Sequence, residues 1–238
     1  MDRARELVEV LTGVLESCSE GVELTAALRD LGVAACTLLP IDAAAVTLVD
    51  DERRLRPVMA TDEVALRISM LQQALGEGPS ISALDEDAPV LVDDLSRHAG
   101  RWPSFTSAAL LAGMRTAAGL PVRIGSATVG SLDLFGRAPR PFTAEDLEVA
   151  EVLARAAAAH VADHRRRMRS EQVVDQLQYA LTSRVTIEQA KGMLAVRLGT
   201  SVDAAFGLLR EEARRRNQRV ADLAGQVIAG ADQDLGAR

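Results

Sequence analysis

The stretch AAGLPVRIGSATVGSLDLF, residues 117–135, carries the clearest fold signal in the chain and predicts a β-hairpin. Its two apolar runs, Ala117–Ile124 and Thr128–Phe135, have the length and composition of strands. Gly125 and Ser126 lie between them and supply a two-residue turn. We therefore expect a β-sheet that contains this hairpin.

Further strands and helices are predicted before the hairpin. Short β-branched or apolar runs predict strands at 45–49, 55–60 and 89–92, and apolar residues at helical spacing predict helices at 4–15, 22–38, 62–74 and 103–113. The order is helix, helix, strand, strand, helix, strand, helix, strand, strand. This order indicates an α/β (α+β) domain with a mixed or antiparallel sheet and helices on its faces.

A long helix is predicted after the hairpin. Residues 139–141 form a proline-rich linker, and Thr143–Asp146 has the spacing of a capping box. From Ala144 onward, no glycine or proline interrupts the helical pattern before Gly192. A narrow apolar seam returns at three-to-four spacing at Val174, Leu177 and Leu181. Long helices with such seams commonly pair, so a connecting helix over 144–172 and a parallel coiled-coil dimer are expected.

Three short amphipathic helices are expected at the C-terminal end. The first is predicted to begin at Thr186, which opens a second capping box, and to end at Gly199. The second follows a cap at 200–203, and the third ends at Gly230. Three such helices close a core only by packing together. The predicted parts are a sensor domain at 1–143, the connecting helix at 144–172, a helical domain at 173–230 and a disordered tail at 231–238.

Charge is divided unevenly along the chain. The whole protein has a net charge of −7, yet residues 1–154 hold 13 basic and 24 acidic side chains, and residues 155–230 hold 13 basic and 8 acidic ones. An acidic first part joined to a basic second part indicates that only the second part meets a polyanion. A solvated, arginine-rich helix is the alternative explanation of the same charges.

Composition argues against several classes of protein. Hydrophobic residues make up 48% and charged residues 26% of the chain, which is typical of a soluble globular protein. No run of about 18 uncharged apolar residues occurs, so we expect a cytoplasmic protein with no membrane partner. Cys18 and Cys36 form no CxxC pair, and His160 and His164 lack further ligands. No metal site and no cofactor are therefore predicted.

Residues 173–230 resemble the ANTAR domain. The match rests on charged, glycine and alanine positions that fall in register: Leu177-Gln178-Tyr179-Ala180-Leu181-Thr182-Ser183-Arg184, Ile187-Glu188-Gln189-Ala190-Lys191-Gly192-Met193-Leu194, Asp203-Ala204-Ala205-Phe206, Leu209-Arg210 and Leu223-Ala224. This resemblance implies an RNA-binding, three-helix antiterminator module that grips paired hairpins in a nascent transcript.

Residues 20–165 resemble a GAF domain. The resemblance rests on Gly76-Glu77-Gly78-Pro79, Val90-Leu91-Val92-Asp93-Asp94-Leu95, Leu120-Pro121-Val122 and Gly130-Ser131-Leu132-Asp133-Leu134-Phe135. It implies a sensor fold, whose members bind cyclic nucleotides, chromophores, haem or no known ligand, so no ligand and no ligand-binding residue are carried over. In relatives that pair these two domains a cysteine often follows the Gly-Glu-Gly-Pro loop. Ser80 stands there in this chain, which argues against thiol chemistry at that point.

Nine residues of the C-terminal part are candidates for RNA binding: Tyr179, Arg184, Lys191, Arg197, Arg214, Arg215, Arg216, Asn217 and Arg219. The planar fork of arginine suits phosphates and guanine edges, and unstacked loop bases stack on aromatic rings. Arg184 and Lys191 lie seven residues apart, so an unbroken helix can present both on one face. Tyr179 is expected either to stack on a base or to pack against a partner helix.

Other residues receive structural expectations. Gly192 is expected to permit a close helix approach, and Ala190 and Ala205 are expected to pack in the small helical core. In the sensor domain, Asp133 and Arg123 lie on predicted strands. A pocket between sheet and helices is one possible environment for them, but we expect both side chains to face solvent.

The sequence thus predicts a signal-responsive bacterial regulator that binds RNA hairpins, acts by transcription antitermination and forms a homodimer. A small molecule or an upstream signalling protein is the expected signal. A DNA-binding regulator is an alternative, although no helix shows Arg, Asn and Gln gathered in its first turn. An enzyme of the GAF fold, such as a methionine sulfoxide reductase, is another. We expect no enzyme, because no catalytic triad order, carboxylate pair or phosphate-binding glycine loop is present and both cysteines fall outside the pocket elements.

Overall fold

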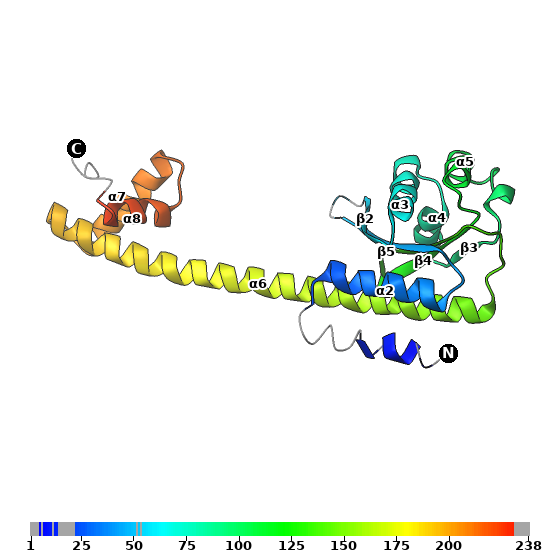
Figure 1. Ribbon diagram of the computed structural model, residues 1–238. Helices are drawn as coiled ribbons and strands as arrows, with labels where there is room; N and C mark the ends of the chain where they lie inside the picture. The colour runs from blue at the N-terminus through cyan, green and yellow to red at the C-terminus, as the bar shows by residue number, and fades with distance from the viewer. Residues whose placement is uncertain are drawn as a thin grey trace. The chain divides into compact units, whose positions relative to one another are not determined.

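The computed structural model describes residues 5, 7–10, 12, 13, 22–50, 52 and 54–230 (Figure 1). The chain divides into two units, residues 1–166 and 167–238. The predicted tail 231–238, Cys18 and part of the predicted helix at 4–15 lie outside the described residues, as do the side chains of Val174, Leu177 and Leu181.

A five-stranded sheet forms the centre of the first unit. Its strands are β1 (Ala43–Val49), β2 (Leu55–Ala60), β3 (Val90–Val92), β4 (Thr116–Ile124) and β5 (Ala127–Gly136). They lie in the order β2-β1-β5-β4-β3, and every neighbouring pair is antiparallel. The predicted hairpin is confirmed as β4 and β5, and β5 lies in the middle of the sheet.

Helices cover both faces of this sheet (Figure 1). One face carries α3 (Glu63–Leu75), α4 (Pro79–Glu86) and α5 (Pro103–Leu111), and the other carries α2 (Leu24–Leu38) and the first part of α6 (Ala144–Leu198). Side chains alternate between the two cores because successive strand residues point to opposite faces. On β1, Ala43 and Ala45 join the α3–α5 core, and Ala44 and Val46 join the α2–α6 core.

The predicted helices at 22–38, 62–74 and 103–113 are confirmed within two residues by α2, α3 and α5. Helix α4 and the short 3-10 helix Leu95–Arg97 were not predicted. Helix α4 has only eight residues, which is too few to show a clear helical period. It begins at Pro79, a residue favoured at the first helical position because it has no N–H to leave unpaired.

Helix α6 is continuous over 55 residues from Ala144 to Leu198. Its predicted capping box is confirmed: the backbone N–H of Asp146 donates to Thr143 Oγ1 at 3.1 Å, and that of Thr143 donates to Asp146 Oδ2 at 3.0 Å. The predicted helix start at Thr186 is wrong. The hydroxyl of Thr186 donates to the carbonyl of Thr182 one turn back, as it does within a running helix.

The second unit builds a small helical core of its own. The last part of α6 packs with α7 (Val202–Arg215) and α8 (Val220–Ile228). The predicted cap of α7 is confirmed, since the N–H of Ala204 donates to Ser201 Oγ at 3.2 Å. As expected, Ala190 and Ala205 are fully buried. They pack with Leu194, Leu209, Ala213, Leu223, Ala224 and Val227.

Two further properties concern the described residues alone. No single helix among them is long and apolar enough to cross a membrane, although the bent pair Thr182–Leu198 and Val202–Arg215, at 107°, together meets the test of length and composition. Likewise, no three His, Cys, Asp or Glu side chains in this part of the chain are grouped so that they could hold a metal ion.

Candidate functional site

The end of α7 and its link to α8, residues 214–219, which we call the α7–α8 turn, gather five of the candidate RNA-binding residues. Arg214, Arg215, Arg216, Asn217 and Arg219 are all exposed. Asn217 adopts a left-handed backbone conformation with φ of 51°, which asparagine tolerates better than most residues and which ends α7. The fold therefore presents these residues at the C-terminal end of α7 and on the short link that follows it.

Glu212 organises two of these arginines. Its carboxylate accepts hydrogen bonds from Arg215 Nε at 2.8 Å and from Arg216 Nε, three and four residues further along the chain. The hydrogen bonds from Arg215 and then Arg216 lower the pKa of Glu212 to about 2. One negative charge is thus shared by two positive ones, and the turn keeps an excess of positive charge.

Tyr179 and Arg219 connect α6 to the start of α8. The guanidinium carbon of Arg219 lies 5.5 Å from the centre of the Tyr179 ring. Its hydrogen bond with the Tyr179 hydroxyl raises the pKa of Arg219. Tyr179 remains 47% exposed, so part of its ring is open to solvent. Both residues of this pair were predicted as candidates, and the fold brings them together across 40 positions of sequence.

Lys191 lies deeper than the other candidates. Its ammonium group donates to both carboxylate oxygens of Glu188, at 2.9 and 3.0 Å. It also lies 5.0 Å from the ring centre of Phe206 on α7, and the side chain is only 13% exposed. Arg210 approaches the same ring at 5.8 Å. Lys191 therefore fastens α6 to α7, and little of its charge faces solvent.

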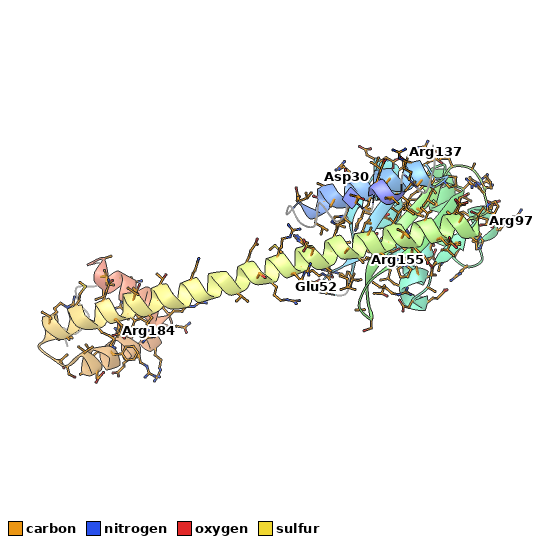
Figure 2. The ribbon with its side chains drawn as sticks, turned by 90° about the horizontal axis from the view of Figure 1, so that it is seen from below. Asp30, Glu52, Arg97, Arg137, Arg155 and Arg184 are labelled. Carbon is orange, nitrogen blue, oxygen red and sulfur yellow. The ribbon has the colours of Figure 1, made fainter. Side chains whose placement is uncertain are left out.

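Arg184 and Arg197 lie elsewhere on α6. Arg184 is exposed (Figure 2), and it forms no ion pair with any residue that the structure describes. Arg197 borders an apolar groove of about 480 Å³ that Gly192, Met193, Leu194, Val196 and Val227 also line. A Cβ added at Gly192 would meet nothing within 4 Å, so the expected close helix approach at this glycine is wrong for the described chain.

Asp133 contradicts the expectation that it faces solvent. It lies on β5, whose two faces are both covered by helices, and its exposed fraction is 0%. Its carboxylate accepts hydrogen bonds from four hydroxyls: those of Ser80, Ser131 at 2.6 Å, Thr47 at 2.7 Å and Ser69 at 3.3 Å. Desolvation raises the pKa of Asp133, against the opposing effect of these hydrogen bonds. Arg123, in contrast, is exposed as expected and donates to Asp87 Oδ1 at 2.9 Å.

The Gly76-Glu77-Gly78-Pro79 loop joins three helices. Glu77 Oε2 accepts the backbone N–H groups of Ser104 and Phe105 at 2.9 Å each, and thereby caps the start of α5. Gly78 has φ of 121° and lies against Gln72, so a side chain there would be both strained and obstructed. Ser80 follows the loop, and its backbone N–H donates to Gln72 Oε1 at 2.9 Å. The Gly76-Glu77-Gly78-Pro79 motif therefore has a structural role, because its residues and Ser80 connect α3, α4 and α5.

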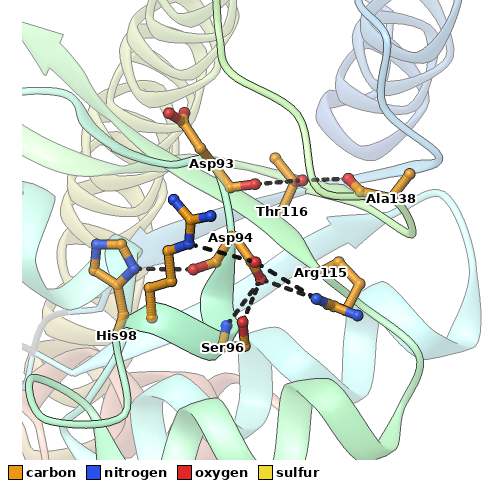
Figure 3. A network of polar contacts seen from close by, with 8 residues as sticks. Asp93, Asp94, Ser96, His98, Arg115, Thr116 and Ala138 are labelled. Atoms are coloured by element: carbon orange, nitrogen blue, oxygen red, sulfur yellow. Dashed lines mark hydrogen bonds and ion pairs between the residues drawn. The ribbon is translucent and has the colours of Figure 1, made fainter.

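A second polar network follows β3 (Figure 3). Asp94 Oδ1 accepts from Ser96 Oγ at 2.8 Å and from Arg115 Nη2 at 3.2 Å. The backbone carbonyl of Asp93 accepts from Thr116 Oγ1 at 3.2 Å and from the N–H of Arg140 at 2.9 Å. Because Arg140 also donates to Asp146 at 3.3 Å, this network ties β3 to the first turn of α6.

Two surface cavities of the first unit have the size of small-ligand sites. One holds about 390 Å³ and is lined by Val49, Arg54, Leu55, Gln73, Ile81, Leu84 and Asp85. The other holds about 300 Å³ and is lined by Pro89, Leu120, Pro121, Arg123, Glu151, Ala154 and Arg155. The first lies beside α3 and α4. Arg123, for which the sequence offered a pocket as one environment, lines the second cavity. No sequence pattern marked the other lining residues, because each cavity is assembled from separate segments.

Comparison with known proteins agrees with the division of the chain into two units. The family model described as GAF domain matches residues 22–162, and the model described as ANTAR domain matches residues 175–228. Among solved structures, the GAF domain of a phosphoenolpyruvate-protein phosphotransferase from Coxiella burnetii is similar with a TM-score of 0.53 and 19% identity, covering 70% of this chain and 98% of that one. The corresponding domain from Acinetobacter gives a TM-score of 0.52 and 16% identity, with coverage of 68% and 95%. These likenesses concern the fold. No curated protein gives a significant match.

Proposed function

Because the chain belongs to the GAF domain family and carries a C-terminal ANTAR domain, we propose that it is a signal-responsive regulator that binds hairpins in nascent mRNA leaders. The ANTAR domain implies RNA-binding antitermination, and the GAF domain suggests signal sensing. The proposed RNA-binding domain covers 173–230, behind a sensor at 1–143 and a connecting helix at 144–172. Antitermination acts on transcripts during synthesis, so the proposed location is the cytoplasm.

The exposed cationic turn between α7 and α8 is the observation that carries this proposal. RNA presents a dense row of phosphates, and arginine guanidinium groups bind them through paired, charge-assisted hydrogen bonds. Arg214, Arg215 and Arg216 lie on that turn beside Asn217 and Arg219. We assign phosphate contacts to this group, together with Arg184 and Arg197 on α6.

Tyr179 is proposed to read an unpaired base. Hairpin loops expose bases that stack on aromatic side chains, and a guanidinium beside the ring adds a second flat surface. The contact between Tyr179 and Arg219 supplies both groups in one place. Lys191 is proposed to act mainly by holding α7 against α6, since its charge is engaged by Glu188.

A homodimer is proposed to present two RNA-binding domains to two hairpins. Apolar side chains are exposed on α6 beyond the sensor at Met168, Val173 and Val185. A long helix with unpartnered apolar positions is stabilised when it pairs with a second helix. The signal that acts on the sensor is proposed to be a small molecule or an upstream signalling protein.

An RNA-binding titration tests the function. The full chain is titrated against a labelled leader RNA with two hairpins, and the triple variant Arg214→Ala, Arg215→Ala, Arg216→Ala is compared with Arg97→Ala, which removes an exposed arginine of the sensor. Loss of two or more phosphate contacts is expected to weaken binding roughly tenfold or more at low salt. Arg97→Ala should bind normally.

Duplex DNA of equal length serves as the competitor in the same titration. Displacement of the hairpin RNA by equimolar duplex would contradict RNA recognition and favour a DNA-binding regulator instead. Equal affinity of the triple variant and the wild type would place the RNA contacts outside the α7–α8 turn.

A further inference from the structure

The cluster around Asp133 belongs to the first unit, whereas every residue proposed to meet RNA belongs to the second. It joins four elements. Thr47 comes from β1, Ser69 from α3, Ser80 from α4, and Ser131 shares β5 with Asp133. All five side chains are at least 98% buried. A carboxyl group is unusual in such a buried position, because burial of a charge costs free energy unless an opposite charge accompanies it.

We propose that Asp133 and its four hydroxyl partners form a proton-sensitive latch, in which protonated Asp133 keeps α3 and α4 seated on the sheet and ionised Asp133 loosens them. This inference concerns regulation of the sensor and goes beyond the proposed RNA binding. It does not depend on RNA binding, since its test contains no nucleic acid.

The surroundings of Asp133 contain no compensating cation among the described residues. Its hydrogen-bond partners from β1, α3, α4 and β5 are all hydroxyls, and its cross-strand neighbours are Ala45 on β1 and Gly119 on β4. None of these side chains is titratable or charged. The negative charge is therefore balanced by dipoles alone, which is less favourable than an ion pair in a low-dielectric site.

The direction of the pH effect follows from this environment. Desolvation raises the pKa of Asp133 in the closed arrangement above the ordinary value that it would regain if the cluster opened to water. The closed arrangement thus binds the proton more tightly. Its stability is greatest below the ordinary pKa, decreases as pH rises from there to the raised pKa, and is constant above it.

The same cluster links α3 to α4, so that a change at Asp133 affects both helices. Ser80 is the second residue of α4, and Gln72 of α3 donates to its hydroxyl at 2.7 Å. The start of α4 also rests directly on the sheet, because a Cβ at Gly119 would lie 2.6 Å from the carbonyl oxygen of Pro79. Loosening of Ser80 from Asp133 therefore releases the first turn of α4 and the end of α3 in one step.

Infrared spectroscopy and amide hydrogen exchange on the full chain test the latch. The difference spectrum between wild type and Asp133→Asn is expected to contain a protonated carboxyl band whose midpoint lies above that of an exposed aspartate. Protection factors in residues 63–86 should decrease as pH rises from the ordinary pKa of an aspartate to this midpoint, while those of β4 stay constant. Each unit by which the pKa is raised allows up to a tenfold decrease.

Three variants complete the design. Asp133→Asn cannot ionise, so protection of residues 63–86 should become independent of pH and exceed that of the wild type at high pH. Ser80→Ala removes a donor to the carboxylate and should move the infrared midpoint upward. Asp85→Asn, an exposed carboxyl on α4, should leave both readouts as in the wild type.

The proposal is overturned if the Asp133 band titrates at or below the midpoint of an exposed carboxyl. It is equally overturned if protection of residues 63–86 in the wild type does not change while Asp133 titrates. If Asp133→Asn folds poorly, the midpoint of the infrared carboxyl band in Ser80→Ala still tests the proposal. A midpoint that is unchanged or lowered relative to wild type contradicts the latch.

Discussion

Glu212 accepts hydrogen bonds from both Arg215 and Arg216 and thereby orients two of the cations proposed to meet RNA. Its own charge opposes that of the RNA. At the scale of single residues, the candidates of the C-terminal unit therefore differ in how available they are. Arg184 and Arg214 are exposed, Tyr179 and Arg219 form a pair, and Lys191 is engaged by Glu188 and Phe206.

Replacement of Glu212 by Gln tests its two roles. The folded-state pKa of Glu212 is about 2, below the ordinary value of 4.5, so its carboxylate stabilises the folded state above pH 4.5 and this contribution is lost as pH falls toward 2. Thermal unfolding of E212Q should therefore occur at a lower temperature than that of wild type at pH 7, with the difference vanishing near pH 2. RNA affinity at pH 7 should rise, because one negative charge is removed.

The control for this prediction is Glu188→Gln, whose carboxylate binds Lys191. It removes the same charge from the domain but leaves the α7–α8 turn intact. An equal gain of RNA affinity in both variants would indicate a general charge effect, and a difference between wild type and E212Q that persists at pH 2 would contradict the assigned pKa shift.

At the scale of elements, two glycines differ in what surrounds them. Gly119 on β4 lies against the backbone of Pro79 and Ser80, so α4 can rest on the sheet only where a side chain is missing. Gly192 lies in the interior of α6 with open space where a Cβ would be. The first glycine is thus required by packing, and the second is not required by any contact among the described residues.

Alanine substitutions distinguish the glycine that packing requires, Gly119, from the glycine that it does not require, Gly192. Gly119→Ala should lower the free energy of unfolding by about 1–3 kcal/mol, since the backbone of α4 must shift to admit the methyl group. Gly192→Ala should raise it by about 0.5–1 kcal/mol through helix propensity alone. Urea unfolding of the full chain measures both, with each domain's transition followed separately. Equal effects of the two substitutions would contradict this account.

At the scale of the whole molecule, the change of charge near residue 155 lies close in sequence to the boundary between the two units at residue 166. The acidic part contains the sheet of the GAF domain, and the basic part contains the helices of the ANTAR domain. Helix α6 belongs to both, since it begins against the sheet and ends in the small helical core. A polyanion is therefore expected to be attracted by one unit and repelled by the other.

Salt dependence tests this division of charge. Binding of hairpin RNA by the full chain should weaken linearly in a plot of log affinity against log salt, with a slope of about 0.7–0.9 per phosphate contact. The triple arginine variant of the α7–α8 turn should show a smaller slope than the wild type, whereas Arg97→Ala should keep it. A slope that is unchanged in the triple variant would exclude the turn as the main phosphate contact.

Local patterns in the sequence were sufficient to determine the hairpin of β4 and β5, the capping box at Thr143, the core alanines Ala190 and Ala205, and the two domain families. Hydrophobic period, turn residues and caps act over a few residues, so each can be read within its own segment. Patterns of this kind also mislead, as at Thr186, where a capping spacing occurs inside a continuous helix.

Only the tertiary structure decided three features: the burial of Asp133, the contact of Lys191 with the Phe206 ring, and the pairing of Tyr179 with Arg219. Each depends on a partner from a distant element: Thr47 and Ser80 lie 86 and 53 positions from Asp133. A strand residue looks the same in sequence whether helices cover one face of its sheet or both. The coverage of β5 on both faces, which no local pattern encodes, is the physical reason that an aspartate expected in solvent lies at the centre of the sensor.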